Sequence, residues 1–486
     1  MTSSALDAPP VRTSTERSAL TVAFTVIAGT VMIPLDVTVV AVALARLSEE
    51  TGASLPVIQW VSTGYTLALA AVIPTAAWAI GRYGARRVFL TAIGLFTLAS
   101  ALVALSWGTP SLIGFRVLQG VGGGLVMPAA MTLVLRATPP ERRGRVMALL
   151  GLPVLVGPVL GPPLGGFLMD HLSWRWIFLV NLPIGVVAVL LGLRNLPRVP
   201  GDRGVPLDRR GLLLLPPAMA LLVLGTSAVD DSVAEPDAAL PVLAGLVLLA
   251  VFLAHAARRP APLLKVRLLR ERLTGAGSLV LVLFVGAYFS TLFLVPMYFQ
   301  VARGETATAT GLLMMPQAVA AGISIQVSGR LVDRVPPVRV IATGIALATA
   351  GYAAFALLAD GGTSYGWLVL ALSVGTTGAG ATMLPTMTLA TRHLDDADIP
   401  SGSTMINVFN QVATSIVTAA VSVLLARALT ARLPGVDGVG DLQQLPASGR
   451  LEAAPLVAES VRAALLLPVG LMLAAFVVAV VALRRR

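Results

Sequence analysis

The stretch TVAFTVIAGTVMIPLDVTVVAVALARL, residues 21–47, is long and apolar enough to cross a bilayer as a helix, yet it carries one acidic residue, Asp36, in its interior. A carboxyl group at membrane depth is energetically unfavourable whether it is ionised or neutral, and such a residue usually marks a functional site. The interiors of the other predicted spans contain no acidic residue. Asp36 is therefore the first candidate for a residue that does chemical work in this protein.

Apolar runs of similar length recur along the whole chain of 486 residues, of which 56% are hydrophobic and 12% are charged, with a mean hydropathy of +0.86. Soluble domains have about a quarter of their residues charged, so this composition predicts an all-α polytopic membrane protein. The short strands of alternating polarity that a membrane β-barrel needs are not visible. The chain has no cysteine, which excludes disulfides and thiolate metal sites, and we expect no bound metal.

The net charge of +11 comes almost entirely from arginine. Basic residues collect in the cytoplasmic loops of membrane proteins, so this charge predicts a topology rather than a nucleic-acid partner. Residues 1–20 are polar and lack the features of a secretory signal, and we expect them to form a cytoplasmic tail.

Hydropathy predicts about fourteen spans, whose Arg-rich connections alternate with short neutral or acidic ones. The positive-inside rule then places the Arg-rich connections and both termini in the cytoplasm, with the chain in the inner (cytoplasmic) membrane of a cell. The spans are expected near residues 21–45, 56–80, 87–107, 110–135, 144–169, 175–194, 210–229, 238–257, 273–301, 308–332, 338–358, 364–390, 401–429 and 461–483.

Two basic turns occupy comparable places in the two halves: AWAIGRYGARR follows the second span and SGRLVDRVPPVR follows the tenth. Weak internal symmetry of this kind is expected of a transporter built from repeated helix bundles. Residues 430–460 are predicted to form an external loop, which is either a gating lid or a flexible connector. The predicted domains are an N-terminal tail (1–20), a six-helix bundle (21–200), two extra transmembrane helices with linkers (201–262) and a second six-helix bundle (263–486).

The depths of two charged residues predict a pair inside the N-terminal bundle. Asp36 lies about 15 residues into the first span, roughly 22 Å from the cytoplasmic side, and Arg116 lies roughly 9 Å from the outer side in the fourth span. In a core about 30 Å thick both fall in the outer half and can face a common cavity. Apolar surroundings favour a protonated aspartate and a nearby arginine favours an ionised one, so helix movement between these settings would load and release a proton. The alternatives are a static ion pair or an arginine at the membrane interface.

One face of the fourth span combines polar residues with glycines. Arg116, Gln119, Gly120, Gly123 and Met127 share this face through their spacing of three and four residues. Glycines let a neighbouring backbone approach closely. The face is typical of a helix that lines a cavity, although glycine clusters in membrane helices often serve packing alone.

The fifth span contains GLPVLVGPVLGPPLGG, in which Gly157, Gly161 and Gly165 repeat every four residues. This repeat predicts a flat face for close helix contact. Pro158 and Pro162 repeat at the same interval and predict a bend. A helix that is both bent and closely packed suits a pivot or a seal.

These motifs resemble the major facilitator superfamily, in particular its fourteen-span drug:proton antiporter branch of multidrug efflux proteins. Gly157, Pro158, Gly161, Gly165 and Gly166 resemble the superfamily's antiporter signature. The sequence LDVTVV at residues 35–40, followed by Ala43 and Leu44, resembles the first-helix signature of that branch. Further similarities are carried by Arg116, Gln119 and Gly120 in the fourth helix, by the WRWIF and NLP motifs at residues 174–178 and 181–183, and by Tyr298, Gln300, Gly304, Gly311 and Pro316.

The resemblance implies a major facilitator fold with two six-helix bundles, two extra central helices and a proton-linked arginine at Arg116. It also implies a cytoplasmic gate in the two basic turns, made of Arg82, Gly84 and Arg86 and of Gly329, Asp333 and Arg334. The first turn departs from the family pattern, because Gly81 stands where an aspartate is usual and Ala77 where a glycine is usual. We therefore expect a weaker charge lock in the N-terminal half. Asn410 stands where the thirteenth span often has an arginine.

Aromatic and methionine side chains suit varied apolar ligands because they are adaptable and polarisable. Each such residue on its own is as readily explained by ordinary packing. With Asp36 as the one buried acid, we expect monocations and neutral lipophiles to be better substrates than dications. The candidate substrate-cavity residues are Trp60, Tyr65, Gln119, Met127, Tyr288, Phe293, Met297, Asn407 and Gln411.

The leading functional prediction is a proton-driven exporter of lipophilic drugs or antibiotics, working by alternating access. The alternatives are a dedicated exporter of an endogenous metabolite, peptide or lipid, and an uptake symporter, against which the antiporter signature argues. An enzyme is not expected, because the three histidines, His171, His255 and His393, lie in different connections. We expect no cofactor other than the proton gradient. The expected partners are a small-molecule substrate, protons and the lipid bilayer, and we expect a monomer.

Overall fold

The computed structural model describes residues 16–53, 55–139, 142–202, 204–228, 236–392, 394–395, 397–433 and 447–483. These residues form helices and connections, without a β-strand. Twelve helices in this part of the chain are long and apolar enough to cross a membrane. Two further helices of 20 residues each, α8 and α11, lie where the sequence predicts the fifth and seventh spans. The all-helical architecture is confirmed, and the fourteen-span count stays a prediction.

The helices match the predicted spans closely, with several spans split by short interruptions. Their bounds are α1 (Glu16–Thr30), α2 (Met32–Thr51), α3 (Leu55–Val72), α4 (Ala76–Tyr83), α5 (Ala85–Ala104), α6 (Thr109–Ala137), α7 (Arg143–Leu149), α8 (Leu152–His171), α9 (Arg175–Leu179), α10 (Asn181–Asn195), α11 (Arg209–Ala228), α12 (Pro236–Arg258), α13 (Arg272–Met297), α14 (Ala307–Leu331), α15 (Pro337–Leu358), α16 (Tyr365–Ala390), α17 (Ile399–Thr430) and α19 (Ala447–Ala482). Short helical turns follow α3 (η1, Ile73–Thr75), precede α13 (η3, Val266–Arg270) and follow it (η4, Tyr298–Ala302).

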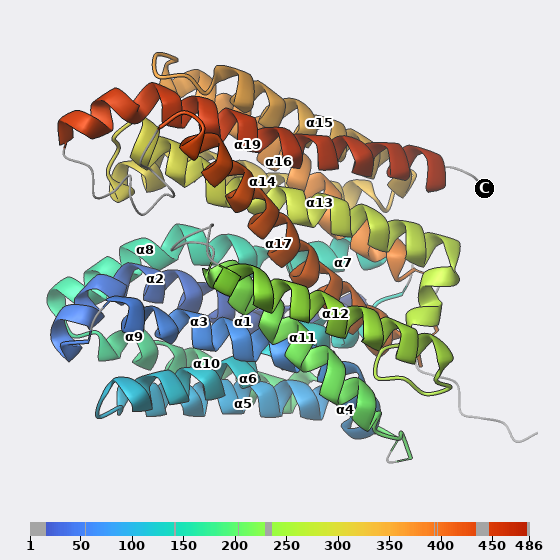
Figure 1. The fold of residues 1–486 in the computed structure, drawn as a ribbon. Coiled ribbons are helices and arrows are strands. Elements are labelled where there is room, and N and C mark those ends of the chain that lie inside the picture. Colours follow the sequence, from blue (N-terminus) through green and yellow to red (C-terminus); the bar gives the residue numbers. More distant parts are fainter. Residues whose placement is uncertain are drawn as a thin grey trace, which may run out of the picture.

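Helices α1 to α10 lie on one side of the molecule and α13 to α16 and α19 on the other, with α17 running between them (Figure 1). In the N-terminal bundle α6 packs against α3 and α5, and α2 packs against α8. In the C-terminal bundle α16 packs against α14 and α15, and α13 packs against α17 and α19. The repeated pattern of neighbours agrees with the internal symmetry predicted from the two basic turns, while the exact domain boundaries stay predictions.

The hairpin of α11 and α12 bridges the two bundles. Leu215 and Met219 of α11 pack with Ile73 of the N-terminal bundle and Val408 of α17 in one hydrophobic cluster. Extra helices in this position cover the seam between α3 and α17.

A buried carboxylate anchors the base of this hairpin. Asp208 accepts hydrogen bonds from the backbone amides of Gly211 and Leu263, and Nε2 of His255 lies 3.0 Å from its Oδ1 atom. Burial raises the pKa of Asp208, but these hydrogen bonds outweigh it and leave the pKa below its ordinary value. The ionised carboxylate therefore ties the start of α11 to α12 and to the following linker.

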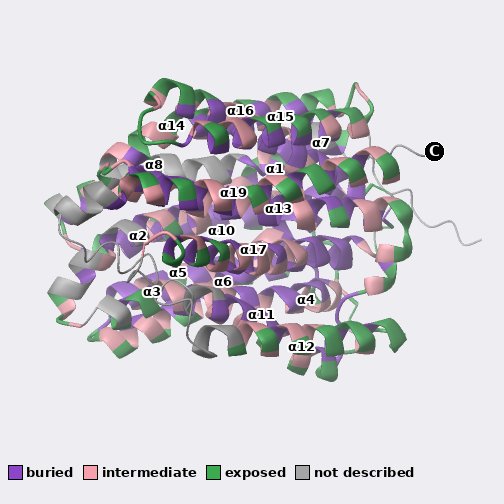
Figure 2. Ribbon diagram, turned by 45° about the horizontal axis from the view of Figure 1, so that its top comes forward, coloured by how far each residue is buried: buried purple, intermediate pink, exposed green. Residues whose placement is uncertain are grey.

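The burial pattern separates interior helices from lipid-facing ones (Figure 2). Most of α6 is buried, whereas α12 and α14 expose apolar side chains such as Leu243, Val247, Leu312 and Ile323. Exposed apolar faces on long helices are expected where lipid is the solvent. The molecule is therefore built as a multi-span membrane protein.

The predicted loop over residues 430–460 is partly wrong. Residues 434–446 lie outside the described part of the chain, but α19 begins at Ala447, fourteen residues before the predicted span. Its first turns contain Arg450, Glu452 and Pro455, which lower the hydropathy without preventing a helix. Ser460 in this extension donates to the Ala428 carbonyl of α17 at 3.1 Å, so the segment is packed rather than free.

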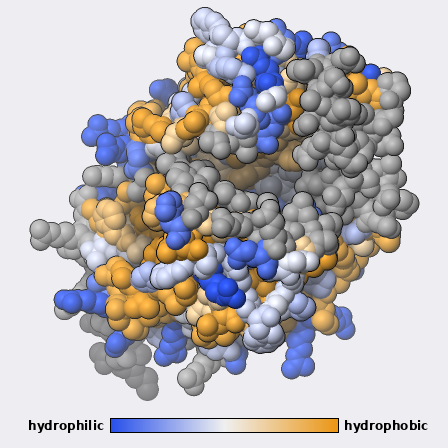
Figure 3. Space-filling view, turned by 90° about the vertical axis from the view of Figure 1, so that its left-hand side faces the viewer, coloured by the Kyte–Doolittle hydropathy of each residue, from blue (hydrophilic) through white to orange (hydrophobic). Residues whose placement is uncertain are grey.

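The bundles are joined at the end that carries the Arg-rich segments. Thr132 on α6 and Ser403 on α17 share a hydrogen bond of 3.1 Å, and Gln326 on α14 donates to the Ala148 carbonyl on α7 at 3.2 Å. Figure 3 views the opposite end and shows a hollow between the two halves, with apolar surface beside it. The described contacts thus close one end of the interface between the bundles.

Candidate functional site

A break in the first span positions Asp36. Pro34 has no backbone N–H to donate to the Thr30 carbonyl, and the helix is interrupted between α1 and α2. Before the break, Gly29 lets α1 pack closely against α5, because a β-carbon at this position would lie 2.8 Å from the Ile93 side chain. The side chain of Asp36 then points into the N-terminal bundle, where its exposed fraction is 0%.

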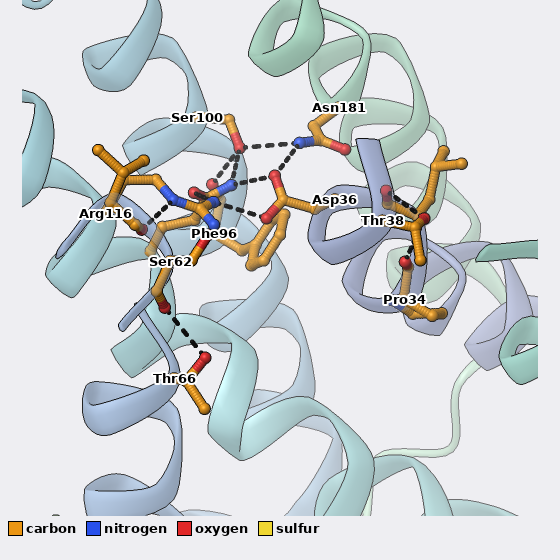
Figure 4. A network of polar contacts seen from close by, with 12 residues as sticks. Pro34, Asp36, Thr38, Ser62, Thr66, Phe96, Ser100, Arg116 and Asn181 are labelled. Atoms are coloured by element: carbon orange, nitrogen blue, oxygen red, sulfur yellow. Dashed lines mark hydrogen bonds and ion pairs between the residues drawn. The ribbon is translucent and has the colours of Figure 1, made fainter. Parts of the chain in front are cut away.

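Arg116 on α6 forms an ion pair with Asp36 inside the bundle (Figure 4). Its Nη1 atom lies 2.6 Å from Oδ2 of Asp36 and also donates to Oε1 of Gln119, and its Nε atom donates to the Val61 carbonyl of α3. The depth estimate correctly places the two charges together. The expectation that they face an open cavity is wrong for this structure, because α3, α5 and α10 enclose both side chains.

Three uncharged side chains complete the network. Gln119 donates through Nε2 to Oδ1 of Asp36 at 3.1 Å and to Oγ of Ser100 on α5 at 2.7 Å. Asn181, the first residue of α10, donates through Nδ2 to the same Oδ1 atom at 3.0 Å. Asp36 therefore accepts three hydrogen bonds, one each from Arg116, Gln119 and Asn181.

The sequence analysis missed part of this network. Ser100 was not predicted at all, and Asn181 was noted only as part of a family motif. Gln119 was predicted to line the substrate cavity, but it is fully buried and binds Asp36 instead. The available signal is weak, because the predicted span of Ser100 also contains Thr91, Thr97 and Ser106, and nothing in the sequence singles out this serine.

Aromatic rings cover the guanidinium group. The Cζ atom of Arg116 lies 4.3 Å from the centre of the Tyr65 ring and 5.5 Å from that of Phe178. Such contacts stabilise a desolvated cation. Tyr65 is 1% exposed in this structure, and its contact with a substrate stays a prediction. Its ring occupies space beside Gly123, where a β-carbon would lie 3.1 Å from the tyrosine hydroxyl.

Glycines on α6 bring the neighbouring helices close to the network. A β-carbon at Gly120 would overlap the Tyr65 carbonyl of α3, and one at Gly122 would lie 2.8 Å from the Phe96 amide nitrogen of α5. This close approach lets Ser100 on α5 bind Gln119 on α6, which in turn binds the Asp36 carboxylate. The glycine face predicted from sequence therefore serves the network as well as packing.

The repeating glycines of α8 pack against α2, the helix that carries Asp36. A β-carbon at Gly157 would lie 2.6 Å from the Pro34 carbonyl, one at Gly161 would overlap Thr38, and one at Gly165 would lie 3.2 Å from the Val39 carbonyl. Thr38 also lies within hydrogen-bonding distance, 2.9 Å, of the Gly157 carbonyl. Close packing by this motif is confirmed.

The remaining glycine of the predicted antiporter motif, Gly166, does not take part in this contact. A β-carbon at Gly166 would meet no atom within 4 Å, so this glycine does not form the close contact. The side chain of Pro158 lies outside the described part of the structure, and its predicted bend stays a prediction.

Several predicted cavity residues belong to the cores of the bundles. Met297 is 8% exposed and lies in the main hydrophobic cluster of the C-terminal bundle, against which Tyr288 and Phe293 also pack. In this structure Met297 is surrounded by apolar side chains of its own bundle, and its contact with a substrate stays a prediction. Tyr288 and Phe293 are partly exposed, as is Met127 on α6, and their role stays a prediction.

The remaining cavity candidates lie in different settings. Asn407 on α17 donates to Sδ of Met131 on α6 at 3.3 Å and to the Ser403 carbonyl at 2.8 Å, so it joins the two bundles. Gln411, one turn further along α17, is partly exposed, and Trp60 on α3 is 44% exposed. Contact of these three residues with a substrate stays a prediction.

The arginines of the first basic turn contact backbone carbonyls at the end of α10 and in the linker after it, and their role as a gate stays a prediction. Arg82 donates to the Val205 carbonyl at 3.2 Å, and Arg86 donates to the Leu193 carbonyl at the end of α10. Gly84 has φ of +86°, a conformation that favours glycine, between α4 and α5. These contacts hold the turn against the linker that follows α10.

The second basic turn is more exposed. Asp333 and Arg334 follow the end of α14 at the surface, and Gly329 is buried within that helix. Their role as a gate stays a prediction. A further contact at this end joins the bundles, because Nη1 of Arg143 lies 3.4 Å from the Arg392 carbonyl.

The C-terminal bundle has a corresponding place with different chemistry. A β-carbon at Gly380 of α16 would lie 2.7 Å from the Ala321 carbonyl of α14, much as Gly124 of α6 faces the Leu69 carbonyl of α3. In this register the position of Gln119 corresponds to Gly375. A β-carbon at Gly375 would lie 3.0 Å from the Tyr352 ring.

An aromatic cluster surrounds that tyrosine. The rings of Tyr288 and Tyr352 lie 6.4 Å apart, and Tyr288 also contacts Phe284 and Phe289. The C-terminal bundle thus has aromatic packing where the N-terminal bundle has an ion pair.

The two described histidines, His171 and His255, have separate neighbours. His171 stacks on Phe167, His255 contacts Asp208, and His393 lies outside the described residues. In the described part of the chain no group of three or more His, Cys, Asp or Glu side chains is arranged to hold a metal ion.

Comparison with known proteins identifies the family. The model of the Major Facilitator Superfamily matches residues 26–418. The multidrug resistance protein B homolog of Mycobacterium tuberculosis is 38% identical over 401 residues, which cover 82% of this chain and 74% of the relative. The putative multidrug resistance protein MdtD of Escherichia coli is 32% identical over 402 residues, which cover 80% of this chain and 82% of the relative.

Solved structures share the fold at low identity. The proton:xylose symporter XylE aligns with a TM-score of 0.62 and 13% identity, covering 94% of this chain and 95% of that one. A bacterial homologue of the iron transporter ferroportin, in an outward-facing state, aligns with a TM-score of 0.60 and 15% identity, covering 96% and 100%. Family and fold together indicate a transporter rather than an enzyme. The chain belongs to the major facilitator superfamily, and its relatives place it in the multidrug efflux family within it.

Proposed function

We propose that this protein exports lipophilic neutral or cationic compounds across the cytoplasmic membrane in exchange for protons, by alternating access. The observation that carries the proposal is the enclosed ion pair of Asp36 and Arg116, with Nη1 and Oδ2 2.6 Å apart. A carboxylate at membrane depth that is held in its ionised form by removable partners is a natural proton-binding group. The names of the relatives support drug-like substrates.

Protonation of Asp36 supplies the driving force for a conformational change. A neutral Asp36 leaves Arg116 as an unpaired charge among Tyr65 and Phe178, and breaking a buried pair in this way costs about 3–5 kcal/mol. A free-energy difference of this size shifts a two-state equilibrium by roughly two to four orders of magnitude. The glycine seam between α8 and α2 transmits the movement, because α2 carries Asp36 and touches α8 through backbone atoms.

The arrangement of the bundles corresponds to a state that opens away from the Arg-rich end. Contacts such as Thr132 with Ser403 close that end, and the hollow in Figure 3 lies at the other. We propose fourteen spans with both termini and the Arg-rich segments in the cytoplasm, so that the hollow faces outward. In this state Asp36 is out of reach of a substrate in the hollow, and it serves the proton rather than the cargo.

Inside-out vesicles with an imposed pH gradient test this function. We expect uptake of a lipophilic monocation such as ethidium, and of a neutral lipophilic dye, to collapse with the gradient in the wild type. Asp36→Asn should abolish the response to the gradient, whereas Asp395→Asn, which changes an exposed carboxylate, should leave it intact. Export by Asp36→Asn at the normal rate with the normal response to the gradient would refute the proposed role of Asp36.

A further inference from the structure

We propose that Asn181 is the positioning residue that accepts the hydrogen bond of protonated Asp36, by turning its side-chain amide through half a revolution. The proposal rests on the proton-coupled function above and adds a second participant to it. It starts from an unusual feature of the network: Oδ1 of Asn181 is buried and has no hydrogen-bond partner among the described residues. A buried amide oxygen left in this way calls for an explanation.

The backbone of Asn181 is held firmly while its amide is not. Asn181 is the first residue of α10, directly after the interruption that follows α9. One turn later Gly185 packs against α5 so closely that a β-carbon would overlap Thr97. At its far end α10 is tied to α1 by a hydrogen bond of 3.1 Å from Asn195 to Thr25. The terminal torsion of an asparagine is broad, so the amide can turn on this fixed backbone.

The other side chains that bind Asp36 cannot accept a hydrogen bond from it without breaking bonds of their own. Arg116 has only donor groups, and its Nη1 atom already binds both Asp36 and Gln119. Gln119 cannot turn without losing the bond that its Oε1 atom accepts from Arg116 and the bond that its Nε2 atom donates to Ser100. The Ser100 hydroxyl donates to the Phe96 carbonyl at 2.9 Å.

In this network, Asn181 is the one residue whose side-chain oxygen accepts no hydrogen bond. Besides Asp36, its Nδ2 atom has only a long contact of 3.5 Å with Ser100. A proton on Oδ1 of Asp36 would point at two N–H donors, those of Gln119 and Asn181, in the observed arrangement. After the amide turns, the new O–H group donates to Oδ1 of Asn181.

This turn lets one residue stabilise both forms of Asp36. The ionised carboxylate accepts from Nδ2 of Asn181, and the protonated carboxyl donates to Oδ1 of the same amide. The charged and titratable groups that face Asp36 from the packed elements are Arg116 on α6 and Tyr65 on α3, whereas Arg175 on α9 lies over the Trp174 ring instead. No other amide near Asp36 in the described network is free to change direction.

Four variants of the full-length protein in proteoliposomes test the proposal. Asn181→Leu removes both donor and acceptor at similar size, Asn181→Gln restores an amide, and Asn181→Asp adds a second carboxylate. The control, Asn195→Leu, makes the same change at the far end of α10, outside the network. The readouts are proton-driven ethidium transport across a range of pH, and ethidium counterflow at one fixed pH, which requires no change in protonation.

For Asn181→Leu we expect proton-driven transport to fall about tenfold at every pH, because both protonation states lose a hydrogen bond, with counterflow kept. Asn181→Gln should recover part of the lost rate. Asn181→Asp should move the midpoint of the pH profile upward by about one unit or more, because two adjacent carboxylates resist ionising together. Asn195→Leu should stay within about threefold of the wild type, since it removes one hydrogen bond between neutral groups, to Thr25, and leaves the network intact.

Three results would overturn the proposal. Wild-type transport and pH profile in Asn181→Leu would show that the amide has no part in coupling. An upward shift of the profile at an unchanged maximal rate would show that Asn181 only braces the ionised carboxylate. Equal loss of transport and counterflow would show a purely structural role. Failure of the proposed function is distinguished separately, by an Asp36→Asn variant that still responds to the pH gradient.

Discussion

The two bundles share a helix arrangement but fill the same place with opposite chemistry. Around α6 the N-terminal bundle encloses Asp36, Arg116 and Gln119, whereas around α16 the C-terminal bundle has Gly375 covered by the Tyr352 ring. An ion pair changes its energy by several kcal/mol when one proton arrives, whereas aromatic packing hardly responds. Under the proposed function, this difference assigns proton sensing to the N-terminal bundle and a fixed framework to the C-terminal one.

The largest expected effect comes from removing the arginine of the N-terminal network. Arg116→Leu leaves the carboxylate of Asp36 buried with only the amide donors of Gln119 and Asn181. We expect a loss of about 3–5 kcal/mol in the stability of the purified protein and the loss of proton-driven transport. Denaturant unfolding in detergent and the vesicle assay measure the two effects. Wild-type stability would mean that the pair is not formed as described.

The glycine seam is the next most sensitive feature. Gly161→Ala places a methyl group onto Thr38 of α2, and we expect a destabilisation of about 1–3 kcal/mol together with slower transport. Gly166→Ala is the matched control from the same motif, because its methyl group would meet no atom within 4 Å. Thermal unfolding and transport rates of the two variants should differ clearly. Equal thermal stability and equal transport rates in the two variants would show that the contact between α8 and α2 has no role in the mechanism.

Replacing both charges of the N-terminal bundle with apolar side chains makes its core resemble that of the C-terminal bundle. The double variant Asp36→Leu with Arg116→Leu removes both charges, so we expect stability within about 1–2 kcal/mol of the wild type, well above that of Arg116→Leu alone. Proton-driven transport should remain absent. A double variant that is less stable than both single variants would show that the pair stabilises the fold rather than switching it.

The smallest effect is expected in the aromatic cluster. Tyr352→Phe keeps the ring against Gly375 and removes one hydroxyl, so stability should change by less than about 1.5 kcal/mol. The pH profile of transport should not move. A shifted pH profile would place a second proton-linked group in the C-terminal bundle. Proton sensing would then not belong to the N-terminal bundle alone.

The sequence predicted those features that carry a strong periodic or energetic signal. A single acid in an apolar run marked Asp36, and counting residues from the two membrane faces placed Arg116 beside it. The four-residue repeat of Gly157, Gly161 and Gly165 predicted close packing, and the structure adds that α2 is the partner.

Features that depend on which helices meet could not be predicted in the same way. Ser100 and Asn181 are single polar residues on other helices, and only the three-dimensional arrangement brings them to Asp36. Tyr65 and Met297 have the composition of cavity residues but face the interiors of their own bundles. The helix before residue 461 was missed because its charged residues lower the hydropathy.

The central claim, that Asp36 binds the transported proton, is tested most directly by proton release on substrate binding. Purified protein in weakly buffered detergent solution is mixed with ethidium while a pH indicator records the released protons. Because binding of proton and substrate to an antiporter is reciprocal, we expect the wild type to release up to about one proton per chain and Asp36→Asn to release none. Undiminished release from Asp36→Asn, with ethidium binding intact, would contradict the account.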